Sequence, residues 1–153
     1  MTRIRIPCMS WVLVCDGAKA LIFRNRGDDD IVVLETVDVM VEPHPPAREL
    51  GSDRPGRVRE SGSASRSAVA EINRHDEAEA TFLARVAERL DERLGASERR
   101  GLIVVAPPRV LGLLRGRLTP GARDNLTAEI AKDLAHLATA EIEKHLSEAQ
   151  RRG

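Results

Sequence analysis

The spacing of apolar residues predicts a β-hairpin near the start of the chain. Residues Met9–Cys15 are apolar on both faces of an extended segment, as expected of a central strand in a sheet. The pair Asp16-Gly17 is a strong signal for a two-residue turn. Residues Ala18–Arg24 then return as the second strand of the hairpin.

A third strand is predicted over Ile31–Glu42, after the acidic turn RGDDD. The segment is rich in valine, and β-branched residues favour strands. Successive side chains of a strand point to opposite faces. Because Glu35 and Asp38 are three residues apart, we expect them on opposite faces of the sheet.

The spacing of apolar residues changes to a helical period after residue 75. Asp76 is followed three residues later by Glu79, which is the spacing of a capping box, so a helix is predicted to begin at Asp76. Gly95 is predicted to end it. The apolar stripe of this helix contains Phe82, Leu83, Val86, Leu90 and Leu94.

The stretch GLIVVAPPRVLGLLRGRL predicts a strand followed directly by a helix. Residues Leu102–Ala106 form a short apolar run without polar alternation, which is typical of a strand buried on both faces. Pro107 cannot donate a ladder hydrogen bond, and Pro108 suits the first turn of a helix. The free N–H groups of such a helix start favour an anion, which makes Arg109 a candidate anion-binding residue. The alternative for Arg109 is a salt bridge or a plain surface position.

The last third of the chain allows two interpretations. Four leucine or isoleucine residues between Leu126 and Leu137 recur at helical spacing and favour one long helix. Thr127, Ala128 and the break at Asp133 also permit a strand followed by a helix from Thr139. With no internal repeat, the 153 residues predict one α/β domain, a sandwich with a mixed sheet of about five strands flanked by helices.

A long connection separates the third strand from the helix. From Pro43 to about Arg74 the chain is rich in proline, glycine, serine and arginine, and it has almost no large apolar residue. Such a segment cannot contribute to a core, and we expect it to be a flexible loop within the domain. Four arginines stand against one acid, Glu60, between residues 54 and 66, namely Arg54, Arg57, Arg59 and Arg66.

Charge and composition exclude several classes of protein. The 24 basic and 24 acidic side chains balance, so no global field draws the chain to nucleic acid or an anionic membrane. With three aromatic side chains and no tyrosine, a surface that stacks RNA bases is excluded. Cys8 and Cys15 lie in one extended segment, too far apart to bridge each other. The N-terminal apolar run is too short to span a bilayer, so we expect a cytoplasmic protein.

The sequence predicts no catalytic, metal or cofactor site. The serines of SGSAS lack the context of a nucleophile elbow. His75, Asp76 and Glu79 could contribute to a metal site at the helix start, but helix capping already accounts for the two acids. We therefore predict that the protein is not an enzyme. Nothing in the sequence predicts its oligomeric state.

Five quoted stretches resemble the bacterial host-attachment protein family. They are SWVLVCDGAKALIF, GSDRPGR, HDEAEATFLARVAERL, VVAPPRVLGLLRGRL and EIAKDLAHL, and their order and spacing match from about Ser10 to Leu146. The combination of APPRVLG with KDL is the most specific part of the resemblance. The family name implies a part in attachment to host cells, but it implies no chemistry and no partner.

That family in turn resembles the middle domain of archaeal and eukaryotic peptide-chain release factors. This second resemblance implies a strand over Leu126–Asp133, against the helical period. Release factors carry a Gly-Gly-Gln tripeptide in the loop that corresponds to residues 43–74, and this loop enters the peptidyl-transferase centre. The present chain has no glutamine there, since its only glutamine is Gln150. Ester hydrolysis is therefore not implied for this chain.

Two functional hypotheses remain. In the first, the protein is a non-catalytic module that binds the ribosome or another structured RNA, because arginines on a flexible tether can fold onto phosphates. The residues assigned to this role are Arg54, Arg57, Arg59, Arg66 and Arg109. In the second, the protein is an interaction or attachment factor whose loop binds a protein or polyanion partner without RNA.

Overall fold

The protein is an α/β sandwich built on a mixed sheet. The computed structural model describes residues 4–28, 30–42, 64–95 and 101–152, and for residues 64–75 and 152 it describes the backbone alone. Within this part of the chain the sheet has five strands in the order β3-β2-β1-β4-β5. The strands are β1 (Trp11–Cys15), β2 (Lys19–Asn25), β3 (Leu34–Val41), β4 (Leu102–Ala106) and β5 (Leu126–Ala131). Strands β1, β4 and β5 are parallel, whereas β2 and β3 run antiparallel to their neighbours.

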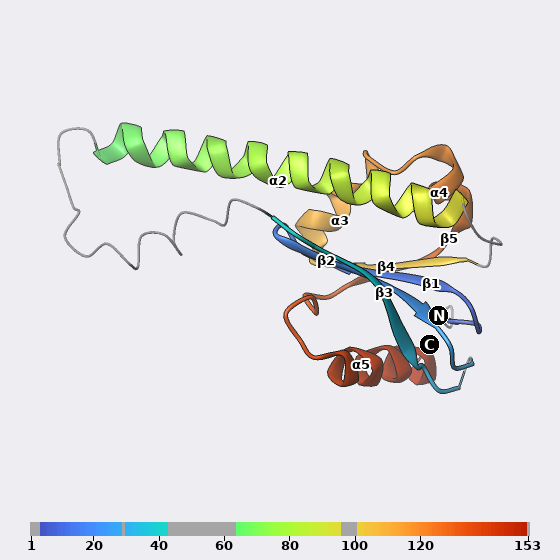
Figure 1. Cartoon of the computed structure of the whole chain (residues 1–153). Helices are drawn as coiled ribbons and strands as arrows, with labels where there is room; N and C mark the ends of the chain where they lie inside the picture. The colour runs from blue at the N-terminus through green and yellow to red at the C-terminus, as the bar shows by residue number, and fades with distance from the viewer. Residues whose placement is uncertain (1–3, 29, 43–63, 96–100, 153) are drawn as a thin grey trace.

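Helices cover both faces of the sheet. Three of the described helices, α2 (Ala64–Gly95), α3 (Pro108–Arg115) and α4 (Pro120–Asn125), lie on one face, and α5 (Thr139–Arg152) lies on the other (Figure 1). The two faces have separate apolar clusters. This arrangement confirms the predicted α/β sandwich with a mixed five-stranded sheet.

The central strand β1 shows why its sequence is apolar throughout. Trp11, Leu13 and Cys15 pack beneath α2 and α3, while Val12 and Val14 pack toward α5. All five residues of the strand are buried. A strand covered on both faces has no polar side of its own, which is the reason its sequence lacks alternation.

The hairpin between β1 and β2 is confirmed, with its turn one residue later than predicted. The backbone N–H of Asp16 donates to the carbonyl of Lys19 at 2.9 Å, so Gly17 and Ala18 are the central residues of the turn. The carboxylate of Asp16 accepts the N–H groups of Ala18 and Lys19, both at 2.8 Å. Asp16 therefore acts as the residue that closes the turn with its side chain.

The last third of the chain contains a strand and a helix. β5 begins at Leu126 and ends at Ala131, two residues before the predicted end at Asp133, and α5 begins at Thr139. β5 pairs in parallel with β4. This pairing satisfies the outer backbone edge of the buried strand β4, a requirement that the local helical period does not express.

Helix α2 begins earlier than predicted. It starts at Ala64 instead of Asp76, so residues 64–74, which were expected in the flexible loop, are helical, and Asp76 lies inside the helix. The sequence from Ala64 to Leu94 contains neither proline nor glycine, so nothing stops the helix from extending backward. The rest of the predicted loop, residues 43–63, lies outside the described residues.

Among the residues whose side chains are described, α2 packs on the sheet from Phe82 onward. At 1.5 Å per residue its 32 residues span about 48 Å. None of residues 76–81 is buried, whereas the stripe predicted from the sequence is buried from Phe82 onward. The N-terminal half extends past the edge of the sheet (Figure 1).

No helix in the described ranges is both long enough and apolar enough to cross a membrane.

Candidate functional site

The carboxyl ends of β1 and β4 lie next to each other, where an open α/β sheet commonly binds a ligand. Pro107 occupies the N-cap of α3 without a side-chain hydrogen bond, and Pro108 is the first helical residue, as predicted. Arg109 follows, and its side chain is 61% exposed. This is the position where the sequence suggested an anion site.

The guanidinium of Arg109 lies against two carboxylates of α2. One of its nitrogens is 2.6 Å from Glu79 Oε1, and another is 3.5 Å from Asp76 Oδ1. These two acids place negative charge beside the start of α3, which opposes binding of an anion there. The observed geometry is the salt-bridge alternative for Arg109, because the side chain ties α3 to α2.

Glu79 also contacts the β1–β2 turn. A Cβ atom added to Gly17 would overlap the carboxylate of Glu79. Glycine is therefore needed for this close approach, and Glu79 is held between the turn and Arg109. The pair Asp76 and Glu79, which suggested a helix cap, instead marks the point where α2 leaves the sheet.

A β-bulge moves Asp38 to the face of the sheet that carries α2. The register between β2 and β3 shifts between Ile22, which pairs with Asp38, and Phe23, which pairs with Thr36, so Val37 is the extra residue. Because residues on both sides of a bulge can share a face, Glu35 and Asp38 lie on the same face. Their predicted placement on opposite faces is wrong for this reason.

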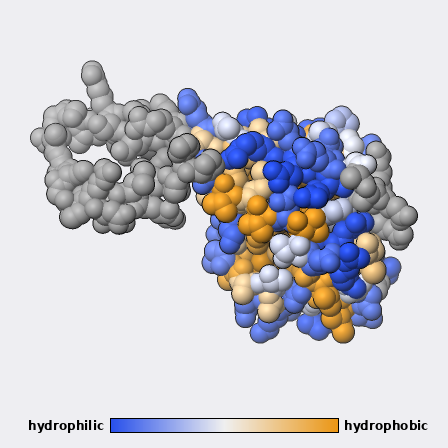
Figure 2. Space-filling view, in the orientation of Figure 1, coloured by the Kyte–Doolittle hydropathy of each residue, from blue (hydrophilic) through white to orange (hydrophobic). Residues whose placement is uncertain are grey.

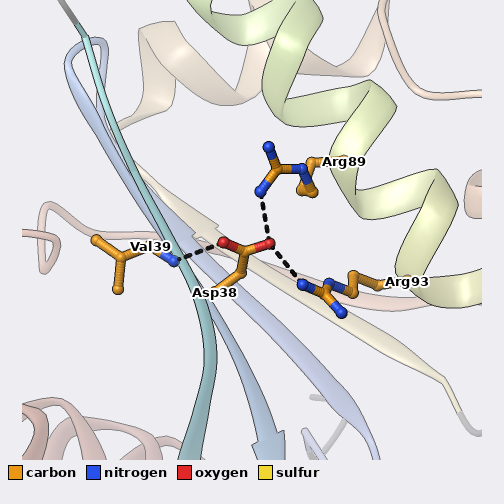
Figure 3. Close-up of polar contacts among 4 residues, drawn as sticks. All are labelled: Asp38, Val39, Arg89 and Arg93. Carbon is orange, nitrogen blue, oxygen red and sulfur yellow. Dashed lines mark hydrogen bonds and ion pairs between the residues drawn. The ribbon is translucent and has the colours of Figure 1, made fainter.

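Two arginines of α2 bind the carboxylate of Asp38 (Figure 3). Arg89 Nη1 lies 2.7 Å and Arg93 Nη2 lies 3.0 Å from the same oxygen, Oδ2. The other oxygen accepts the backbone N–H of Val39 at 3.0 Å. Burial by itself raises the pKa of Asp38, but the hydrogen bonds and positive charges of Arg89 and Arg93 outweigh it and hold the pKa below its ordinary value.

The arginine spacing on α2 continues by one more turn. Arg85, four residues before Arg89, lies 4.0 Å from the buried carboxylate of Glu42, just beyond the end of β3. Residues four apart share one helix face, so Arg85, Arg89 and Arg93 form a row above the acids of β3. This row was not predicted from the sequence, although the four-residue spacing of the three arginines is visible there.

The outer edge of β3 is partly protected by carboxylates. The N–H of Leu34 donates to Glu143 of α5 at 2.8 Å, and the N–H of Val39 donates to Asp38. Edge strands need such protection because unpaired N–H groups invite pairing with other chains. Hydrophobic side chains still remain at the surface of this region (Figure 2), among them Val39 and Val41.

The predicted arginine site is not assembled by the described residues. Arg54, Arg57 and Arg59 lie outside them, and Arg66 lies in the first turns of α2 with only its backbone described. Arg66 is thirteen residues from Glu79, the partner of Arg109, which is about 20 Å along a helix. Arg66 and Arg109 therefore do not belong to one site.

The described residues also include no group of three or more acids, histidines or cysteines that could hold a metal ion. Burial, together with the charge of Asp16, raises the pKa of the Cys15 thiol to about 12, so this thiol does not ionise near neutral pH. Cys8 and Cys15 are both free, as expected from their separation.

Comparison with known proteins gives one family. Residues 11–146 match the model of the family described as "Protein required for attachment to host cells". The match spans the whole sheet, α2, α3, α4, the first part of α5 and the predicted loop. No curated protein matches the chain.

Proposed function

The chain belongs to this host-attachment family, and from that premise we propose that it is a non-catalytic module that binds the ribosome or another structured RNA. The binding residues in this proposal are the arginines on the N-terminal side of α2, namely Arg54, Arg57, Arg59 and Arg66. The place of action is the cytoplasm, where ribosomes are found.

The observation that carries the proposal is the extension of α2 beyond the sheet. A helix with no fully buried side chain between residues 76 and 81 gains less stability there from packing than it does from Phe82 onward. Its extension carries the backbone of Arg66 away from the domain core. An arginine held at that distance can contact a large polyanion that the compact sandwich cannot approach closely.

The charges of the described residues support this assignment. Arg89 and Arg93 are bound by Asp38, and Arg109 is bound by Glu79. By contrast, the segment from Arg54 to Arg66 carries four arginines and one acid. Arginine binds phosphate oxygens with a planar, two-pronged geometry, so this segment is the better candidate for RNA phosphates. The resemblance of the family to the release-factor middle domain, whose corresponding loop enters the ribosome, motivates the choice of RNA.

Co-sedimentation with ribosomes over a range of salt concentrations tests the proposal. Each arginine that neutralises a phosphate releases a counterion, so four contacts give a slope of log affinity against log salt of roughly −3 to −4. Replacing the four arginines with alanine should flatten this slope and weaken binding to all RNA sequences alike. Arg109→Ala should leave ribosome binding and its salt dependence unchanged, because Arg109 already binds two acids.

A matched control removes the same charge elsewhere. Four exposed arginines far from the start of α2 are suitable, namely Arg5, Arg117, Arg123 and Arg151. If this variant loses ribosome binding as strongly as the first, the effect is one of net charge and the assignment to the α2 segment is wrong.

The second candidate function is an attachment factor that binds a protein or another polyanion without RNA, and the family description favours it. It predicts no association with ribosomes at physiological salt. Absence of binding there, or binding unaffected by the four-arginine change, would reject the RNA proposal in favour of this one.

The non-catalytic part of the proposal has its own test. Its support is the lack of glutamine in residues 43–74 and the raised pKa of the Cys15 thiol. Purified protein added to ribosomes loaded with peptidyl-tRNA should release no peptide. Release that a substitution in residues 43–74 abolishes would show that the protein is an enzyme.

A further inference from the structure

A groove runs between α2 and the segment that follows α3. Its volume is about 590 Å³, within the usual range of about 300–1,000 Å³ for ligand sites. Small residues line part of it, namely Ala84 and Ala87 of α2 and Gly116. Because these side chains are short, the groove admits a chain segment close to the helix backbone.

Three carboxylates of α2 line the same groove. Glu88, Asp91 and Glu92 are all exposed, and the one basic residue in the lining is Arg117. Asp91 accepts a hydrogen bond from the Thr119 hydroxyl at 2.8 Å. Glu88 has no ion-pair or hydrogen-bond partner within the residues that the structure describes. Within the residues that the structure describes, the lining therefore carries three acids against one basic side chain.

Arg89 and Arg93 of α2 compensate this charge only in part, because their guanidinium groups donate to Asp38 above β3. Arg89 is close enough to Glu92 for electrostatic attraction, but its guanidinium donates to Asp38. Arg93 donates to the same carboxylate. The packed half of α2 thus separates its charges, with arginines bound over β3 and carboxylates open on the groove.

We infer that this groove is a docking site for a basic peptide segment of a protein partner. Such a segment complements the groove in charge and in shape. The aliphatic stems of lysine or arginine side chains can lie along Ala84, Ala87 and Gly116 while their charged ends reach Glu88 and Glu92. A metal ion does not fit the lining, since the described residues contain no group with a metal-ligand arrangement.

This site is independent of the arginine segment proposed to bind RNA, and it attracts the opposite charge. The two surfaces can therefore be tested separately. The full-length variant that lacks Arg54, Arg57, Arg59 and Arg66 should bind a basic peptide as the unchanged protein does.

The test is fluorescence anisotropy of a labelled peptide that alternates arginine and alanine, titrated with the full-length protein at low and at physiological salt. The matched probe carries neutral citrulline in place of each arginine. We expect the arginine peptide to bind, the citrulline peptide to bind at least tenfold more weakly, and binding to weaken with salt. Equal binding of both peptides, or no binding of either at low salt, would overturn the inference.

Two variants locate the binding. Glu88→Gln combined with Glu92→Gln should weaken the arginine peptide roughly three- to tenfold, as expected for two exposed ion pairs. Ala84→Leu keeps the charge and is well tolerated in a helix, but its side chain fills the groove, so it should weaken binding as well. The control combines Asp133→Asn with Glu141→Gln, two exposed acids outside the groove lining, and should leave the affinity unchanged.

Two further results would count against the inference. Equal weakening by the control variant would show that only net charge matters. Self-association of the protein without peptide, lost in the Glu88/Glu92 variant, would assign the groove to a second copy of the chain. Retained thermal unfolding midpoints in all variants ensure that a loss of binding is not a loss of fold.

Discussion

The two halves of α2 differ in what they contact and in the kind of residue that they bury. From Phe82 to Leu94 the helix covers the sheet with an apolar stripe and binds the acids of β3 through a row of arginines. None of residues 76–81 is fully buried, and the helix continues back to Ala64 beyond the edge of the sheet (Figure 1). The boundary between the halves is Glu79, which is held by Arg109 and by the turn at Gly17.

The two halves of the helix are therefore stabilised in different ways. The packed half is fixed by burial of apolar surface, the main source of helix stability in proteins. The extended half depends on helix propensity and on its continuity with the packed half. Substitutions should therefore have large effects on stability in one half and small effects in the other.

The largest difference in stability is expected between substitutions at Leu90 and at Glu77. Leu90 is fully buried, so Leu90→Ala should lower the free energy of unfolding by about 2–5 kcal/mol. Glu77 is exposed, and Glu77→Ala should change it by no more than about 0.5 kcal/mol. Chemical denaturation of both variants measures the difference. Similar values for the two positions would contradict the division of α2 into two halves.

A smaller effect is expected where α2 binds the edge strand. Asp38→Asn preserves the shape of the side chain but removes the charge that Arg89 and Arg93 bind. We expect the free energy of unfolding to fall by about 1–2 kcal/mol at neutral pH. This is toward the low end for charged hydrogen bonds, because both arginines are partly exposed.

The pH dependence of this effect has a definite sign. The folded-state pKa of Asp38 lies below its unfolded value. Its contribution to stability is therefore complete above about pH 4 and is lost as the pH falls through the folded-state pKa. Urea denaturation from pH 7 down to pH 2 should show the difference between the original protein and Asp38→Asn shrinking in this window. A difference that does not change with pH would mean that the charge of Asp38 is unimportant.

The smallest effect on stability is expected at Glu79, the boundary between the two halves of α2. Gly17→Ala forces the carboxylate of Glu79 to move away from the turn, which weakens its pair with Arg109. Because that pair is largely exposed on the arginine side, the loss should be at most about 1 kcal/mol. In a Glu79→Ala background, Gly17→Ala should have no such effect. A double-mutant cycle by thermal denaturation measures the coupling, and additive losses would show that Glu79 does not restrict the turn.

The candidate sites were less predictable than the fold. The sequence singled out Arg109 because of its place after two prolines, but its environment depends on Asp76 and Glu79, about thirty residues earlier in the chain. The arginine row above β3 could have been recognised from its spacing. The groove on the other side of α2 could not, because Gly116 and Thr119 meet α2 only after α3 and α4 are packed.

The sequence by itself determined the elements whose signals are local. The apolar runs of β1 and β4, the glycine turn, the prolines that end β4 and begin α3, and the buried stripe of α2 are all encoded within a few neighbouring residues. Only the tertiary structure decided where α2 begins, on which face Asp38 lies, and that residues 126–131 form a strand. The start of α2 has no local stop signal. The face of Asp38 depends on a bulge in the pairing of β2 and β3, and the strand at residues 126–131 depends on the open edge of β4. Each of these outcomes is set by contacts between segments far apart in the chain, which a local pattern of residues does not contain.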